Sequence, residues 1–129
     1  MRGAGAGFDD ATTVLVVEDD DLVRLVVAEM VREAGFSVVE AGDADEALVV
    51  LVGSSNPISL VLTDIRMPGS MDGVALARRL RATWPQIKIA LISSHPSDAD
   101  TLSCCDAFLA KPFTSQRLIG QVNTLLAAA

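Results

Sequence analysis

Short apolar runs rich in β-branched residues alternate along the chain with segments of helical periodicity. The first run, Thr12 to Val17, is continuously apolar, as in a strand that is buried on both faces of a sheet. Similar runs predict further strands at Phe36–Ala41, Ile58–Thr63, Ile87–Ser93 and Ala107–Ala110. The sequence therefore predicts five short strands.

The intervening segments place apolar residues three and four positions apart, which is the spacing of one face of an α-helix. Asp21 is the expected cap of the first helix, and Asp43 with Glu46 has the spacing of a capping box at the start of the second. The expected helices are Asp21–Ala34, Asp43–Val52, Gly73–Trp84 and Thr114–Ala127.

Strands that alternate with helices at this spacing imply right-handed βαβ units and a doubly wound parallel sheet with helices on both faces. The length of 129 residues suits one domain, and no linker divides it. Residues 1–11 are expected to form a mobile N-terminal tail, because this segment has no apolar core of the kind found in a signal peptide. The folded domain is expected to comprise residues 12–129.

Composition narrows the possible partners. The chain has 17 acidic and 10 basic residues and a net charge of −7, which argues against binding to nucleic acid. No apolar run reaches the roughly 18 residues of a membrane span. The adjacent Cys104 and Cys105 make no disulfide framework and are expected to be packing residues in a reducing compartment. We therefore expect a cytoplasmic protein without a nucleic-acid or membrane partner.

Polar residues follow the predicted strands at their carboxyl ends, where open parallel sheets place their chemistry. Converging carboxylates repel one another unless a cation lies among them, and an all-oxygen site suits Mg²⁺. With a hydroxyl and an ammonium nearby, Asp64 could act as a nucleophile toward a phosphoryl group. Taken singly, however, an acidic run is typical of a solvated helix start, and Asp64 of a turn. The polar residues in question are Glu18, Asp19, Asp20, Asp21, Asp64, Ser93, Ser94 and Lys111.

Because these residues follow successive strands in this order, the chain resembles a response-regulator receiver domain of two-component signalling. The resemblance is to the single-domain, chemotaxis-regulator type. The resemblance covers about residues 12–127. It implies a flavodoxin-like (βα)5 fold with five parallel strands in the order 2-1-3-4-5. Its motifs are Val-Val-Glu18-Asp19-Asp20, Thr63-Asp64-Ile-Arg-Met-Pro68-Gly with Asp72-Gly73, Ser93, and Lys111-Pro112-Phe113.

The resemblance also implies a function for the acidic residues. Asp64 is implied to be the phosphoacceptor, which takes a phosphoryl group from a phosphohistidine of a histidine kinase or a histidine phosphotransfer protein. The implied cofactor is Mg²⁺, with Mn²⁺ as an alternative. Its implied ligands are Asp64, Asp19 directly, Glu18 through a water molecule, and the backbone carbonyl of Arg66.

The remaining motif residues are implied to respond to the phosphoryl group. Ser93 and Lys111 are expected to stabilise it, and Ser93 and Phe108 occupy the two switch positions of the family. The bond between Lys111 and Pro112 is expected to be a cis peptide, although X–Pro bonds are trans by default.

The chain departs from the family in the fourth-helix region. From Ser93 to Lys111 is 18 positions, a few fewer than usual. The shortfall lies at Pro96–Ser103, where weak helix formers allow about two turns at most. A shortened or irregular, mobile fourth helix is therefore expected. Arg66 and His95 lie at positions that tune the lifetime of the phosphoryl group in the family. Arg66 either reaches this group or is a surface arginine, and His95 is expected to be a loop histidine rather than a second phosphoacceptor.

The leading hypothesis is a stand-alone receiver, a monomer or weak homodimer, that binds an unknown downstream protein or relays phosphate. It is expected to promote its own phosphorylation and dephosphorylation without turning over an external substrate, so it is not expected to be an enzyme in that sense. The alternative is a receiver-like interaction module that is not phosphorylated. A phosphohydrolase is disfavoured because Arg66, two residues after Asp64, stands where a general acid would be needed.

Overall fold

The computed structural model describes residues 12–53, 57–95 and 103–127. The expected tail at residues 1–11 lies outside this part of the chain. The described residues alternate strands with helices, as the apolar pattern predicts. In chain order the elements are β2 (Thr13–Val17), α1 (Asp21–Glu33), β3 (Ser37–Ala41), α2 (Ala44–Gly53), β4 (Ile58–Asp64), α3 (Gly73–Thr83), β5 (Lys88–Ser93), β6 (Ala107–Ala110) and α4 (Ser115–Ala127).

All five strands join in one parallel sheet with the spatial order β3-β2-β4-β5-β6. Counted along the chain, this is the order 2-1-3-4-5 of a flavodoxin-like fold, so the predicted topology is confirmed. The central strand β4 pairs with β2 on one side and β5 on the other, which brings the carboxyl ends of these three strands together at one edge of the sheet.

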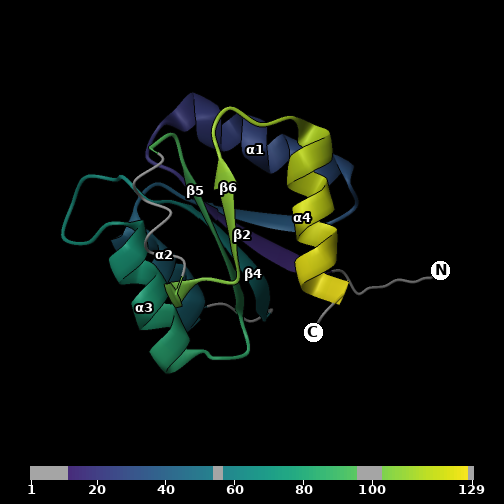
Figure 1. The fold of residues 1–129 in the computed structure, drawn as a ribbon. Helices are drawn as coiled ribbons and strands as arrows, with labels where there is room; N and C mark the ends of the chain where they lie inside the picture. The colour runs from purple at the N-terminus through teal and green to yellow at the C-terminus, as the bar shows by residue number, and fades with distance from the viewer. Residues whose placement is uncertain (1–11, 54–56, 96–102, 128–129) are drawn as a thin grey trace.

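Helices cover both faces of the sheet. Figure 1 shows α1 and α4 on one face and α2 and α3 on the other. Alternate residues of each strand face opposite sides, so the sheet separates two apolar clusters. In β2, Val14 and Val16 pack with α1 and α4, whereas Leu15 and Val17 pack with α2 and α3.

The start of α1 corrects one prediction. The cap is Asp20, not Asp21, and its Oδ1 accepts hydrogen bonds from the N–H groups of Leu22 and Val23, each at 3.0 Å. Asp20 has extended backbone one residue before the helix, so its short side chain can fold back onto the first turn. Asp21 already lies within that turn, where its carboxylate is paired with Arg24.

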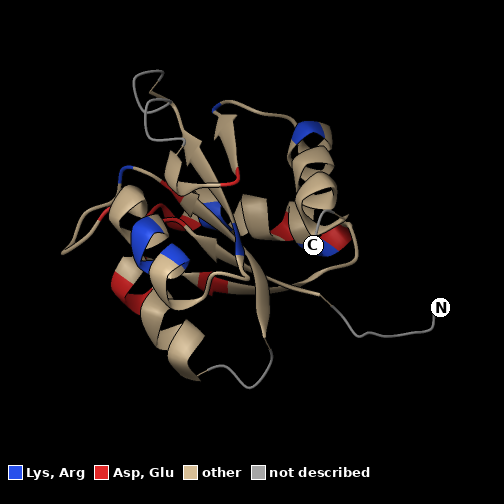
Figure 2. Cartoon of the chain, turned by 60° about the horizontal axis from the view of Figure 1, so that its bottom comes forward, with Lys and Arg blue, Asp and Glu red and all other residues tan. Residues whose placement is uncertain are grey.

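The start of α2 follows the predicted capping pattern. Asp43 Oδ1 accepts a hydrogen bond from the N–H of Glu46 at 2.8 Å. The Glu46 carboxylate reaches back to the N–H of Gly42, one residue earlier than in the standard capping box. The acidic residues of this turn lie on the same flank of the molecule as the arginines of α3 (Figure 2).

The segment between β5 and β6 contains no α-helix in its described residues, which are 94, 95 and 103–106. Four α-helices lie in the described ranges, and the shortening expected of the fourth-helix region falls mainly on residues that the structure does not describe. The irregularity and mobility expected at Pro96–Ser103 fall mainly on residues 96–102, outside the described residues. No helix in the described ranges is both long and apolar enough to cross a membrane.

Candidate functional site

Five polar residues that the sequence singles out lie at the carboxyl edge of the sheet. Glu18 and Asp19 directly follow β2, Asp64 is the last residue of β4, Ser93 is the last of β5, and Lys111 directly follows β6. Because the strands are parallel and adjacent, these chain positions share one edge.

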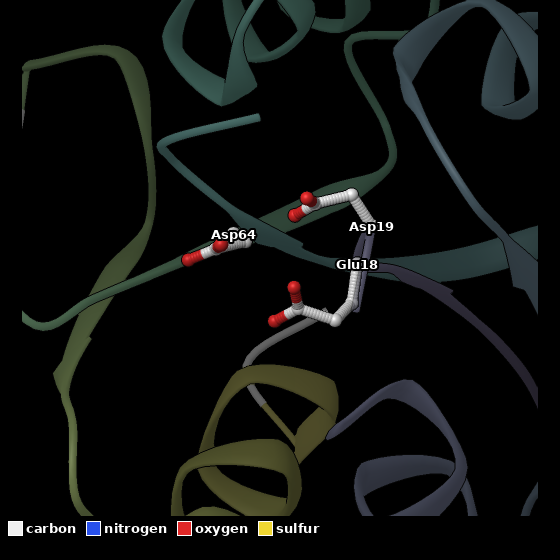
Figure 3. A group of neighbouring side chains, drawn as sticks. All are labelled: Glu18, Asp19 and Asp64. Carbon is white, nitrogen blue, oxygen red and sulfur yellow. The ribbon is translucent and has the colours of Figure 1, made fainter. Parts of the chain in front are cut away.

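Three carboxylates meet at the centre of this edge. Glu18, Asp19 and Asp64 each offer one oxygen, and these oxygens all lie within 4.8 Å of one another. Figure 3 shows the three side chains turned toward a common space from the ends of two neighbouring strands. Glu18 is buried, Asp64 is partly buried and Asp19 is exposed, so the cluster opens to solvent on the Asp19 side.

Lys111 supplies a positive charge beside the carboxylates. Its Nζ donates a hydrogen bond to Glu18 Oε1 at 3.0 Å and lies 3.4 Å from Asp64 Oδ1. Its backbone N–H donates to the carbonyl oxygen of Ser93 at 2.8 Å, which ties the end of β6 to the end of β5. The Lys111–Pro112 peptide bond is cis.

Burial and the pairing of opposite charges shift the pKa values of these groups in opposite directions. Burial raises the pKa of Asp64, and the Asp19 charge adds to this effect, while the Lys111 charge opposes it. Burial also raises the pKa of Glu18, against its hydrogen bonds with the Asp20 N–H and with Lys111. For Lys111, burial would lower the pKa, but its contacts with Glu18 and Asp64 outweigh burial and raise it. The cluster therefore favours an additional cation.

The backbone around Asp64 is held by its neighbours. Thr63 Oγ1 donates a hydrogen bond to the carbonyl oxygen of Asp64 at 2.9 Å. The N–H of Gly73, the first residue of α3, donates to the carbonyl oxygen of Ile65 at 2.8 Å. A Cβ on Gly73 would overlap the Asp64 carbonyl oxygen, so only glycine permits this approach. The Asp-Gly motif of the sequence gave no indication of this contact.

The other expected site residues lie around the carboxylates at different depths. Ser93 is buried, and its Oγ accepts a hydrogen bond from the N–H of His95 at 2.9 Å. Phe108 pairs in register with Leu91, two residues before the end of β5, and packs against the cluster under α2 and α3. Arg66 is exposed, two residues beyond Asp64.

The donor set fits a hard divalent cation. Carboxylate oxygens are the ligands that Mg²⁺ prefers, and a small number of them leaves room for the waters that this ion retains. The ammonium of Lys111 borders the same space, so an anionic group could be held between a cation and Lys111 while touching Asp64. The arrangement can therefore bind a metal and present a carboxylate nucleophile to a phosphoryl group.

Comparison with known proteins decides the family. The family described as response regulator receiver domain matches residues 14–123. The chain belongs to the response regulator receiver family. Receiver domains are phosphoacceptor signalling domains of two-component systems, not enzymes that turn over an external substrate, and they bind Mg²⁺ through acidic residues.

Curated relatives carry this receiver domain within longer chains. The chain is 37% identical over 120 residues to the sensor kinase CckA of Brucella abortus, covering 90% of this chain and 13% of the kinase. It is 34% identical to the transcriptional regulatory protein AruR of Pseudomonas aeruginosa, covering 88% of this chain and 48% of that protein. The receiver domain thus spans about half or less of these relatives.

Solved receiver structures share the fold. A response regulator receiver protein from Sinorhizobium medicae superposes with a TM-score of 0.83 at 34% identity, covering 92% of this chain and 97% of its own. The response regulator TrrA of Thermotoga maritima, solved in complex with Mg²⁺-BeF, gives a TM-score of 0.82 at 28% identity, covering 89% of this chain and 99% of its own.

Proposed function

We propose that this receiver domain accepts a phosphoryl group on Asp64 from a phosphohistidine of a histidine kinase or histidine phosphotransfer protein. The phosphorylated form then signals through phosphorylation-dependent contacts with other proteins or passes the phosphoryl group on. The observation that carries the proposal is the joint placement of Asp64, two further carboxylates and the Lys111 ammonium at one sheet edge.

The transfer exchanges one bond to phosphorus for another. The P–N bond of the phosphohistidine breaks, a P–O bond to the Asp64 carboxylate forms, and the imidazole nitrogen keeps the electron pair and takes a proton from solvent. Bound Mg²⁺, or Mn²⁺ as an alternative, supplies positive charge to the phosphoryl oxygens. Glu18, Asp19, Asp64 and the backbone carbonyl of Arg66 are the residues proposed to hold the ion.

Lys111 and Ser93 are proposed to receive the transferred group. Lys111 already lies beside Asp64, so its ammonium can pair with a phosphoryl oxygen once the Asp64 carboxylate is modified. The Ser93 hydroxyl, at the end of the neighbouring strand, is proposed to bond a second phosphoryl oxygen and to draw the following loop inward. Phe108 has no hydroxyl, so packing alone would hold its inward state.

Two observations bear on how the domain acts. The solved chains of the S. medicae receiver protein and of TrrA match this chain over nearly their whole length, which supports the proposal that a receiver domain of this size can fold without a further domain. Cys104 is buried and the adjacent Cys105 is half-buried, as expected of packing residues, and we propose a cytoplasmic location for the exchange.

Incubation with acetyl phosphate tests the proposal. With Mg²⁺ present, the wild-type protein should gain the mass of one phosphoryl group in intact-protein mass spectrometry, and the gain should disappear when the metal is chelated. Asp64→Asn is expected to remain unmodified while keeping its fold, as checked by circular dichroism. A wild-type protein that stays unmodified with both acetyl phosphate and a phosphorylated histidine kinase would support the alternative of an interaction module that is not phosphorylated.

A further inference from the structure

Arg24 is a basic residue that lies next to the loop carrying Glu18 and Asp19, two of the three clustered carboxylates. Its side chain, on α1, is only 19% exposed. Nη1 donates a hydrogen bond to the backbone carbonyl oxygen of Glu18 at 2.8 Å, and Nη2 donates to Asp21 Oδ1 at 2.7 Å. Nε lies 3.4 Å from Glu40 Oε1. One guanidinium therefore joins the loop after β2, the first turn of α1 and strand β3.

The carbonyl that Arg24 binds belongs to the peptide unit between Glu18 and Asp19. Because a peptide unit is planar, holding its carbonyl oxygen also fixes the direction of the Asp19 N–H and the position of the Asp19 Cα. On the other side of Glu18, its own N–H donates to the carbonyl oxygen of Ala41 in β3 at 3.1 Å. The backbone that carries two of the three carboxylates is thus held from outside the acidic loop.

We propose that Arg24 is a positioning residue for the divalent cation: it holds the Glu18–Asp19 peptide so that both carboxylates remain directed toward Asp64. The inference rests on the proposed function, because it assigns Mg²⁺ to this cluster. The guanidinium reaches the site through a backbone oxygen rather than through a ligand oxygen. Its fork of N–H donors serves three partners at once, which a lysine ammonium on a flexible stem does not reproduce.

When Arg24 is removed, the loss of its charge and the loss of its positioning role predict opposite changes in Mg²⁺ affinity. Loss of a positive charge beside three carboxylates would strengthen their attraction for a cation. Loss of the hydrogen bond to Glu18 would let the Glu18–Asp19 peptide take other orientations, and the ion would then have to order it on binding, which weakens affinity. The direction of the change in Mg²⁺ affinity therefore distinguishes the two roles.

Arg32 offers a matched control on the same helix. It pairs with the other oxygen of Glu40, at 3.0 Å, and with Glu29 at 3.3 Å. In the described part of the chain, none of its ion pairs involves residues 18–20. Arg32→Met therefore removes the same charge from the same network but leaves the Glu18 carbonyl bound.

The experiment measures Mg²⁺ affinity of the unphosphorylated full chain by isothermal titration calorimetry for wild type, Arg24→Met, Arg24→Lys and Arg32→Met. Urea denaturation without metal is recorded in parallel, so that a general loss of stability is separated from a loss of affinity. Arg24→Met is expected to bind Mg²⁺ about tenfold more weakly, the usual effect of losing a residue that orients a metal ligand. Arg24→Lys should also bind more weakly, and Arg32→Met should stay within about twofold of wild type.

Unchanged or tighter Mg²⁺ binding by the folded Arg24 variants would overturn the positioning role. If Arg24→Met does not fold, Arg24→Lys, which keeps the charge and the aliphatic stem, decides the question. A wild-type protein that binds no Mg²⁺ would overturn the proposed function and this inference with it. Wild-type binding combined with unchanged binding by the variants would overturn the inference alone.

Discussion

At the scale of single residues, the position of Asp64 depends both on its charged neighbour and on the close packing of its backbone. Lys111 bridges Glu18 and Asp64, and Gly73 allows α3 to begin against the peptide that follows Asp64. These contacts fix Asp64, the proposed phosphoacceptor, more firmly than its place at a strand end alone would do.

Gly73→Ala is expected to destabilise the protein by about 1–3 kcal/mol, because the new methyl group would overlap the Asp64 carbonyl oxygen and force α3 away from β4. Urea denaturation measures the change in the free energy of unfolding. Gly120→Ala is the matched control: Gly120 is exposed within α4 with no atom near its missing Cβ, so alanine should stabilise by about 0.5–1 kcal/mol. Equal effects of the two substitutions would contradict the close approach at Gly73.

The sequence pattern predicts that residues which directly follow or end apolar runs, such as Glu18, Asp64 and Lys111, lie together at one edge of the sheet, and the structure brings these three together. The same pattern placed the α1 cap at Asp21 instead of Asp20, since adjacent aspartates have the same capping chemistry and only backbone conformation separates them. The pattern did not predict the contact between Arg24 and Glu18, because a hydrogen bond to a carbonyl six residues earlier leaves no periodic signal.

At the scale of elements, β6 is a short edge strand that needs help from side chains. Asp106, just before it, accepts hydrogen bonds on Oδ2 from the N–H of Ile89 at 2.8 Å and from Arg81 at 2.9 Å. Its own N–H donates to the carbonyl oxygen of Ile89 at 2.8 Å. One aspartate thus fastens the start of β6 to β5 and to α3.

Asp106→Asn is expected to lower the free energy of unfolding near neutral pH by about 1 kcal/mol, a value kept small because Arg81 is 38% exposed. Burial alone would raise the pKa of Asp106, but Arg81 and the Ile89 N–H outweigh it and lower the pKa. A lowered folded-state pKa gives stability above the unfolded-state pKa that is lost as the pH falls through the folded-state value. Urea denaturation should therefore show the difference between variant and wild type shrinking below about pH 4.

The exposed Glu33 at the end of α1 provides the control for this charge change. Glu33→Gln removes one negative charge without removing the bonds of Asp106, so it should alter stability by about 0.5 kcal/mol or less. A loss at Asp106 that stays constant from neutral to strongly acidic pH would contradict the ionic part of the interaction.

At the scale of the whole molecule, the acidic edge costs the metal-free protein stability. Burial raises the pKa values of Glu18 and Asp64. Since their folded-state pKa values lie above the unfolded-state values, this cost grows as the pH rises through that interval and is fully present above it. A bound cation would remove the cost, so folding and metal binding should be linked.

Mg²⁺ is expected to raise the free energy of unfolding at neutral pH, by about 2.7 kcal/mol when its concentration is one hundred times the dissociation constant. Thermal denaturation at matched ionic strength measures this gain. Asp64→Asn should be more stable than wild type without metal at neutral pH, because the carboxylate whose pKa is raised by burial is gone. The same variant should gain much less from Mg²⁺, and an equal gain in both proteins would place the ion elsewhere.

The sheet divides the interior into two compartments whose side chains do not mix, since neighbouring residues of β2 point into different clusters. A change of volume under α2 and α3 therefore has little direct route to the packing under α1 and α4. Each pair of helices is free to diversify its outer surface, and the interior beneath it, with limited effect on the opposite pair. Substitutions during evolution can therefore change what one face of this protein binds, while the opposite face and the cluster of three carboxylates stay the same.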